Sequence, residues 1–229
     1  MKNKTNNCII CLNGALRKRL VTAFIRQNPS KNSFKLLAAD GSSGSLLKFN
    51  IIPDFIIGDL DSVSGSTLSF CKTRGSKIVR VKEQEHNDFE KSVSFALKKG
   101  LTNIAVIGFD GKRNDHLLNN YSILKKYSSE CRIKLFDNQF EIFFLPKSYS
   151  FQYKIGKEIS LIAFPKAGGI DTHGLKYGLE NGELIFGKRE GALNKASDKK
   201  ITISFKSGEI LIFKRHFYNL SFEKIFSSC

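Results

Sequence analysis

The stretch Asp54-Phe-Ile-Ile-Gly-Asp-Leu-Asp-Ser62 is the most informative part of this chain. Its apolar half predicts a short buried strand, which delivers two carboxylates, Asp59 and Asp61, one residue apart. If the strand continues through them, alternate side chains share one face, and both carboxylates point the same way. Like charges held together raise each other's pKa, and a hard cation such as Mg2+ relieves the repulsion. The alternative is a solvated turn with Ser62 capping a helix.

Five more short apolar runs surround this strand in the first part of the chain, and segments with helical spacing lie between several of them. This alternation predicts an α/β domain over residues 1–137, with a mainly parallel, Rossmann-like sheet covered on both faces. Ligands of such sheets bind beyond the carboxyl ends of the strands. The expected strands are 8–12, 34–39, 55–57, 77–81, 104–107 and 133–136, and the clearest helices are 89–97 and 117–124.

Beyond residue 137 the pattern changes to short β-like runs, with no convincing helix between them. Turns are expected at Gly168-Gly169, Asn181-Gly182 and Ser207-Gly208. We therefore predict that residues 138–229 form a C-terminal antiparallel all-β sandwich domain. Its expected strands are 141–145, 150–153, 159–164, 183–186, 200–205 and 209–213.

Composition indicates an ordinary folded protein, because 41% hydrophobic residues with 20 Phe are ample for a core. No apolar run is long enough to span a membrane, and the first residues lack the apolar region of a signal peptide, so we expect a cytoplasmic protein. Cys8 and Cys11 have redox or zinc spacing, but they lie inside an apolar run, which favours buried thiols.

The net charge of +16 suggests a polyanionic partner. The basic residues are spread from Lys2 to Lys224 without a long basic block or an aromatic-rich binding motif. A small polyanionic substrate explains the charge as well as nucleic acid does, and nucleic acid stays a runner-up.

Acidic residues also follow other expected strands of the first domain, and in a parallel sheet all these junctions lie along one edge. Each has a structural alternative: Asn87 and Glu90 form a capping box, and a lone His116 is more often packed or solvated. Acids for a metal beside bases for phosphate indicate phosphoryl transfer, although the chain lacks a P-loop and a kinase His-Arg-Asp set. The converging residues are Asp40, Asp59, Asp61, Asp88, Lys112, Arg113 and Asp115.

The order of these segments resembles the thiamine pyrophosphokinase family over nearly the whole chain. The acid motif and a motif in the second domain are the specific parts of the resemblance. The matching segments are Ala39-Asp40-Gly41, Pro53-Asp54 with Gly58-Asp59-Leu60-Asp61-Ser62, Asn87-Asp88-Phe89-Glu90-Lys91, Gly111-Lys112-Arg113-Asn114-Asp115-His116 and Thr172-His173-Gly174-Leu175-Lys176-Tyr177-Gly178-Leu179.

The resemblance implies a homodimer that transfers pyrophosphate from ATP to the hydroxyl of thiamine, with Mg2+ held by Asp59, Asp61 and Asp88. It also implies that Tyr177 is an aromatic platform for thiamine at the dimer interface; without the resemblance Tyr177 would be a core tyrosine. The proton acceptor is left open between Asp88 and Asp115. The implied nucleotide-binding residues are Asp40, Gly41, Gln84, Gly111, Lys112, Arg113, His116 and Asn120, and the implied thiamine-binding residues are Thr172, Gly174, Leu175, Tyr177 and Asn194.

The chain departs from the family at two places that bear on substrate binding. Residues 42–45 are Ser-Ser-Gly-Ser where the family usually has Gly-Ala-Asn-Arg, and Leu193 stands where members often place Ser. Two alternatives therefore remain: the same fold acting on a different heterocyclic alcohol, and a catalytically impaired binder of thiamine or nucleic acid. The binder ranks last, because such a protein has no use for all three metal acids.

Overall fold

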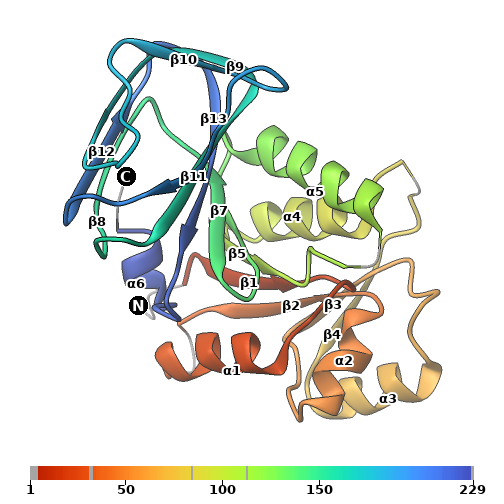
Figure 1. The fold of residues 1–229 in the computed structure, drawn as a ribbon. Helices are drawn as coiled ribbons and strands as arrows, with labels where there is room; N and C mark the ends of the chain where they lie inside the picture. The colour runs from red at the N-terminus through yellow and green to blue at the C-terminus, as the bar shows by residue number, and fades with distance from the viewer. Residues whose placement is uncertain (1–4, 31–32, 84, 112, 228–229) are drawn as a thin grey trace. The chain divides into compact units, whose positions relative to one another are not determined.

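The computed structural model describes residues 5–30, 33–83, 85–111 and 113–227. The chain divides into two compact units (Figure 1), and each has its own set of internal contacts. The first unit is Met1–Asn138 with Leu220–Phe222, and the second is Gln139–Asn219 with Glu223–Cys229. Within the described ranges, no helix is both long and apolar enough to cross a membrane.

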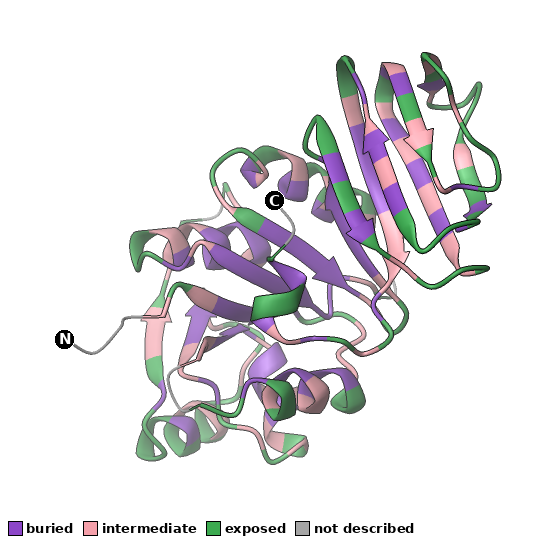
Figure 2. Ribbon diagram, turned by 90° about the vertical axis from the view of Figure 1, so that its left-hand side faces the viewer, coloured by how far each residue is buried: buried purple, intermediate pink, exposed green. Residues whose placement is uncertain are grey.

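The first unit is built on six parallel strands in the order β4-β3-β2-β1-β5-β6. The central strands β1 and β5 are apolar and almost wholly buried, as Figure 2 shows, which is typical of a parallel sheet covered on both faces. All six strands expected in this part of the chain are present to within two residues. They are β1 (Asn7–Cys11), β2 (Lys35–Ala39), β3 (Phe55–Gly58), β4 (Lys77–Arg80), β5 (Asn103–Ile107) and β6 (Arg132–Phe136).

Helices connect these strands, and both expected helices are confirmed as α4 and α5. The side chain of Asn87 accepts a hydrogen bond from the Glu90 backbone N–H at 3.0 Å, so the predicted cap of α4 forms. The cap of α3 is Ser64, which accepts from Thr67 N at 3.2 Å; the suggestion of Ser62 was two residues early. The helices are α1 (Lys18–Gln27), α2 (Ser42–Lys48), α3 (Gly65–Thr73), α4 (Asp88–Lys98) and α5 (Asn114–Tyr127).

The side of the sheet on which successive strands are added changes at β1. The chain adds β2, β3 and β4 on one side of β1, and then β5 and β6 on the other side. In such sheets the loops after the strands meet at one edge and form the ligand-binding region near this change of side. The loops that follow β1, β2, β3 and β5 are therefore where the site must be sought.

Three residues near the C-terminus, Leu220–Phe222, belong to the first unit; we call them the C-terminal strap. The Asn28 amide donates to Leu220 O at 3.0 Å and accepts from Phe222 N at 3.0 Å. The Phe222 ring lies 5.9 Å from that of Phe34 and 6.3 Å from that of Phe24. The strap therefore completes both the hydrogen bonds and the aromatic packing at the end of α1.

In the second unit antiparallel strands pair in the order β7-β13-β9-β12-β8, and β10 and β11 also pair with β9. Apolar side chains alternate along these strands and form one buried cluster. The strands are β7 (Phe140–Phe144), β8 (Ser148–Gln152), β9 (Glu158–His173), β10 (Gly182–Ile185), β11 (Gly191–Lys195), β12 (Lys200–Ser204) and β13 (Ser207–Arg215), followed by the short helix α6 (Phe222–Ile225).

The turn expected at Gly168-Gly169 is wrong, because β9 continues through these residues to His173. The strand changes partners there: Gly168 pairs with β13, whereas Asp171 pairs with β12. Gly169 has a φ of +63°, and a Cβ on it would lie within 2.9 Å of three carbons of the Lys206 side chain. The two glycines thus let one long strand bend between two sets of partners.

Candidate functional site

The expected alternation of Asp59 and Asp61 along a strand face is not what the structure has. Strand β3 ends at Gly58, and Leu60 takes a left-handed conformation with a φ of +71°. Asp59 Oδ1 accepts a hydrogen bond from the Asp61 backbone N–H at 3.3 Å, and Asp61 is exposed. The two acids therefore belong to a tight loop after the strand. Its left-handed leucine is the kind of strained conformation that collects at functional sites.

Asp40 and Asp88 both lie next to the position that a side chain on Gly58 would occupy. A Cβ on Gly58 would lie 2.9 Å from the Cβ of Asp40 and 3.4 Å from Oδ1 of Asp88. Asp40 directly follows β2, and Asp88 begins α4, so two separate connections deliver the pair. The absent side chain at position 58 leaves the room in which both carboxylates are held.

These carboxylates are unusually placed for charged groups. Asp40 is 1% exposed; its Oδ2 accepts from the Ser62 backbone N–H at 3.0 Å, while its buried Oδ1 has no hydrogen-bond partner within the described residues. The pKa of Asp88 is raised, first by burial and then by repulsion from Asp40 and from Asp59. An unpartnered oxygen and mutual repulsion are both relieved by a bound cation.

The acids do not form a ready-made metal cage. Across the described ranges, no group of three or more His, Cys, Asp or Glu side chains is positioned to hold a metal ion. Asp88 interacts electrostatically with Asp40 and with Asp59, whereas Asp61 contacts Asp59 through its backbone N–H. A Mg2+ ion usually binds to one or two carboxylates and takes its other ligands from water and substrate phosphates, so the arrangement suits Mg2+ bound together with a phosphate ligand.

The loop after β1 and the loop after β5 are hydrogen-bonded to each other. Gly14 N donates to Gly108 O at 2.9 Å, and a Cβ on Gly14 would lie 2.1 Å from Asp110 O. Arg17 forms an ion pair with Asp110 at 2.9 Å. Asn13, Gly14 and Arg17 were not predicted as site residues, although their position just after the first strand was the available signal.

Several residues predicted to bind nucleotide lie on these same loops. A Cβ on Gly41 would meet Nδ2 of Asn13 at 2.6 Å, and one on Gly111 would meet the Cα of Gly14 at 3.2 Å, so both glycines permit close approach of the loops. Asn120 is buried and donates to Phe109 O at 2.7 Å, which places it beneath the β5 loop as a support. The predicted residues Gln84 and Lys112 lie outside the described residues.

Arg113, Asp115 and His116 are exposed where α5 begins. Nε and Nη2 of Arg113 donate to the two carboxylate oxygens of Asp115 at 3.1 and 2.5 Å. This pairing lowers the pKa of Asp115 to about 2. Asp115 is therefore a weak proton acceptor at neutral pH. The same two hydrogen bonds fix the orientation of the Arg113 guanidinium group at the start of α5.

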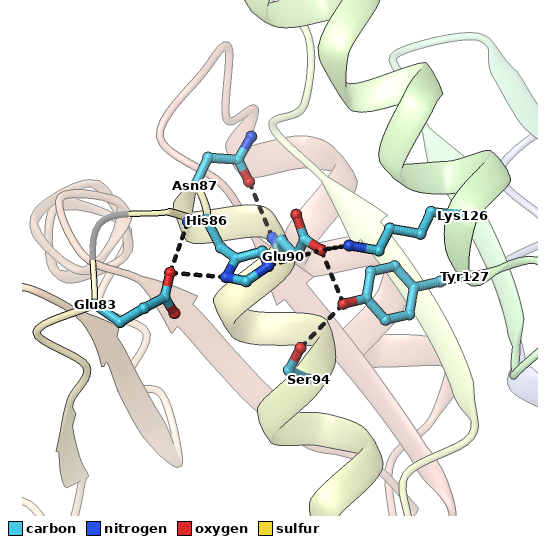
Figure 3. A network of polar contacts seen from close by, with 7 residues as sticks. All are labelled: Glu83, His86, Asn87, Glu90, Ser94, Lys126 and Tyr127. Carbon is cyan, nitrogen blue, oxygen red and sulfur yellow. Dashed lines mark hydrogen bonds and ion pairs between the residues drawn. The ribbon is translucent and has the colours of Figure 1, made fainter.

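Glu90 ties the first turn of α4 to the last turn of α5, as Figure 3 shows. Its Oε1 accepts from the Tyr127 hydroxyl at 3.1 Å and forms an ion pair with Lys126. His86 reaches the same oxygen through Nε2 at 3.5 Å, and its Nδ1 lies 2.7 Å from Glu83 Oε1. These contacts fix the helix turn that carries Asp88.

The serines that replace the usual family residues after Gly41 point inward. The Ser42 hydroxyl donates to Cys11 O at 2.8 Å, and the Ser43 hydroxyl donates to Asp40 O at 2.8 Å. Both serines are fully buried. Their hydroxyls therefore bind the backbone at the ends of β1 and β2.

The second unit contains a separate pocket of about 190 Å3 beside β9 and β11. Four of the five residues predicted to bind thiamine line it: Thr172, Leu175, Tyr177 and Asn194. Tyr177 is 61% exposed, so the alternative of a core tyrosine is wrong. The other lining residues, which the sequence analysis did not select, are Leu161, Gly178, Leu179, Leu184, Arg189, Glu190, Gly191 and Ala192.

The polar side chains of this pocket also hold its own backbone. Asn194 Oδ1 accepts from Tyr177 N at 3.0 Å, and Asn194 Nδ2 donates to Tyr177 O at 2.7 Å. Thr172 Oγ1 accepts from Leu179 N at 2.8 Å and keeps its own proton to donate. Gly174, with a φ of +80°, would place a Cβ 2.4 Å from Lys200 O, so this predicted site residue is a turn glycine that packs on backbone.

The fold and site define a class of protein: a parallel α/β unit with an acidic edge, followed in the chain by a β unit with its own pocket. Two family models match. "Thiamin pyrophosphokinase, catalytic domain" matches residues 27–135, and "Thiamin pyrophosphokinase, vitamin B1 binding domain" matches residues 148–210. Together they span most of the chain, which belongs to the thiamin pyrophosphokinase family.

Individual proteins are similar at lower identity. Thiamine pyrophosphokinase 1 of Oryza sativa subsp. japonica is 29% identical over 168 residues, covering 68% of this chain but less than two thirds of the relative, 63%. Thiamine pyrophosphokinase of Bacillus subtilis (strain 168) is 28% identical over 187 residues, covering 78% of this chain and 86% of the relative. The crystal structure of thiamine pyrophosphokinase from Bacillus subtilis has a TM-score of 0.77 at 24% identity and covers 91% of this chain and 99% of that one, a likeness of fold.

Proposed function

We propose that this protein is a thiamine pyrophosphokinase, which transfers pyrophosphate from ATP to the hydroxyl of thiamine and releases AMP. The observation that carries the proposal is the convergence of Asp40, Asp59 and Asp88 at the carboxyl edge of the parallel sheet, in a chain of this family. Phosphoryl chemistry depends on positioning and on stabilisation of charge, and this edge offers both.

We assign Mg2+ to Asp59 and Asp88, with Asp61 as the third ligand expected when phosphate is bound. The unpartnered Oδ1 of Asp40 and the repulsion on Asp88 support this assignment. Bound there, Mg2+ would neutralise charge on the phosphate oxygens. Asp40 lies near Asp88 at Gly58 and holds the loop by accepting a hydrogen bond from Ser62 N.

The nucleotide is assigned to the loops after β1, β2 and β5, with Arg113 on a phosphate. For this role Arg113 has to exchange its exposed contact with Asp115 for the ligand, which an exposed ion pair of low net stability permits. The two candidates for the proton acceptor remain Asp88 and Asp115: the pKa of Asp115, lowered by Arg113, counts against Asp115, whereas the raised pKa of Asp88 applies to the metal-free site and would fall once Mg2+ bound there.

Thiamine is assigned to the pocket lined by Thr172, Tyr177 and Asn194. An exposed aromatic face beside donors and acceptors suits a flat pyrimidine and a cationic thiazolium ring. The remaining parts of the proposal are a cytoplasmic homodimer, a Rossmann-like catalytic domain over residues 1–137, and a thiamine-binding β-sandwich over residues 138–229.

The test is to incubate the purified protein with ATP, Mg2+ and thiamine, and to resolve the products by chromatography. Thiamine-dependent formation of AMP and thiamine diphosphate in equal amounts is expected, and Asp59→Asn should abolish both. An Asp59→Asn variant that forms AMP at the normal rate would contradict the metal role. Neither product from folded wild-type protein would contradict the activity.

A second candidate keeps the chemistry and changes the acceptor alcohol. It is favoured by Leu193, which is 84% exposed with a left-handed φ of +57° and lies between two pocket residues, Ala192 and Asn194. A panel of heterocyclic alcohols at equal concentration separates the two candidates. Faster AMP formation with another alcohol than with thiamine would favour the second.

A further inference from the structure

Arg80 stands at the end of β4, next to the loop that carries the acids. In the register of the sheet Arg80 pairs with Gly58, the glycine flanked by Asp40 and Asp88. Strand β4 ends at this residue, so the side chain is delivered to the same carboxyl edge as the acids. Arg80 lies outside the acidic motifs of the sequence and outside the segments that resemble the family.

The guanidinium group is anchored by one nitrogen. Arg80 Nε donates to the backbone carbonyl of Asp59 at 3.2 Å. Within the described ranges Arg80 has no carboxylate partner, and its residue surface is exposed. The terminal nitrogens are therefore available to a ligand at the Asp59 loop.

The chemistry of a guanidinium group matches what this edge lacks. Asp40, Asp59 and Asp88 gather three carboxylates around Gly58 and the Asp59 loop, and a polyphosphate would add further negative charge. A planar guanidinium with free terminal N–H groups makes paired hydrogen bonds to phosphate oxygens. Anchoring through Nε leaves the Nη1 and Nη2 groups to make that pair.

We propose that Arg80 binds a phosphate group of the nucleoside triphosphate at the Asp59 loop. This inference rests on the proposed function and adds a specific residue to its phosphate site. The competing role is purely structural, in which Arg80 acts by holding the Asp59 carbonyl and so the left-handed Leu60. The two roles differ in whether binding of a ligand without phosphate also depends on Arg80.

The experiment measures binding, not turnover. Calorimetric titration of the intact protein with α,β-methylene-ATP and Mg2+ gives the Kd for a triphosphate that lacks the scissile bridging oxygen, and competition with adenosine gives the Kd without phosphate. Arg80→Met should weaken the analogue about 10- to 100-fold, as expected for a charge-assisted pair, and leave adenosine unchanged. Arg80→Lys, which retains the charge, should restore part of the affinity.

Lys77→Met is the matched control, because Lys77 is an exposed cation at the opposite end of the same strand. It should leave both ligands unaffected, which separates a local contact from the loss of general positive charge. The proposal is overturned if Arg80→Met leaves the analogue Kd unchanged, or if it weakens adenosine as much as the analogue. Wild-type protein that binds the analogue through Arg80 but forms no thiamine diphosphate would contradict the proposed function alone.

Discussion

Asp40 and Asp88 both border the space that the missing side chain of Gly58 leaves open. Each would lie within 3.4 Å of a Cβ at position 58, although the two acids are 48 positions apart in the sequence. The pair is brought together by the end of β2 and the start of α4. This closeness underlies the first two predictions.

Replacing Asp88 by Asn should remove activity and stabilise the metal-free protein. Removal of a group that stabilises charge in the reaction typically costs about 100- to 1,000-fold in rate. Because burial and repulsion raise the pKa of Asp88 in the folded state, its ionised form opposes folding. The destabilisation is fully present above the folded-state pKa and disappears below the unfolded pKa of about 3.9.

Urea unfolding of both proteins without metal checks this prediction. The free energy of unfolding of Asp88→Asn should exceed that of wild type at pH 7, and the difference should shrink towards pH 4. Equal stability at pH 7 would contradict a destabilising effect of the buried, ionised Asp88 carboxylate.

Replacing Gly58 by Ala should damage the site and the fold together. The new Cβ would clash with Asp40, and the φ of +154° is unfavourable for alanine, so we expect a loss of about 1–3 kcal/mol in the free energy of unfolding. Gly65→Ala is the control, since a Cβ at this position in α3 meets nothing within 4 Å. Gly58→Ala should lower both the free energy of unfolding in denaturant and the rate of product formation, whereas Gly65→Ala should lower neither. Equal values for the two variants would contradict the role of Gly58.

Replacing Asn194 by Ala should weaken thiamine binding through Tyr177. The substitution leaves the N–H and C=O of Tyr177 without their side-chain partner, which costs about 1–3 kcal/mol for each group left unpaired. The KM for thiamine should rise while the KM for ATP stays constant. Lys195→Ala, at the adjacent exposed position, is the control and should change neither value.

The thiols should resist alkylation in the folded protein. Burial raises the pKa of Cys8 and Cys11 far above the ordinary range, and it raises that of Cys131 to about 12. Since the thiolate is the reactive form, iodoacetamide at pH 8 should modify these residues only after unfolding. A Cys229→Ser background removes the thiol outside the described residues, and mass spectrometry counts the labels. Rapid labelling of Cys8 and Cys11 in the folded protein would contradict this prediction and favour a redox role for these two residues.

Much of the first unit could be predicted from the sequence because strands that are buried on both faces of a parallel sheet appear in the sequence as continuous apolar runs. Each of the six runs became a strand, and the acidic junctions at Asp40, Asp59 and Asp88 met at one edge as expected. The loop conformation between Asp59 and Asp61 was not predictable, since a left-handed leucine has no signature in composition.

The second unit was harder to predict for a physical reason. Strand β9 bends at Gly168 and Gly169 instead of turning back, and glycine serves both purposes equally well. Strand β11 is short and mostly exposed, so it lacks the alternation that marks a strand. The position of Arg80 at the site could not be predicted, because one basic residue among many in this chain is not distinctive in the sequence. Only the pairing of Arg80 with Gly58 in the sheet places it beside the acids.

The C-terminal strap has a consequence for the order of events during synthesis. Leu220–Phe222 supply hydrogen-bond partners for Asn28 and an aromatic neighbour for Phe24 and Phe34, so these contacts form only after synthesis has passed residue 222. N-terminal domains generally begin to fold while translation continues. Here the last step of that folding waits until every strand of the second unit has also been synthesised, so the first unit is completed only after the strands of the second have been made.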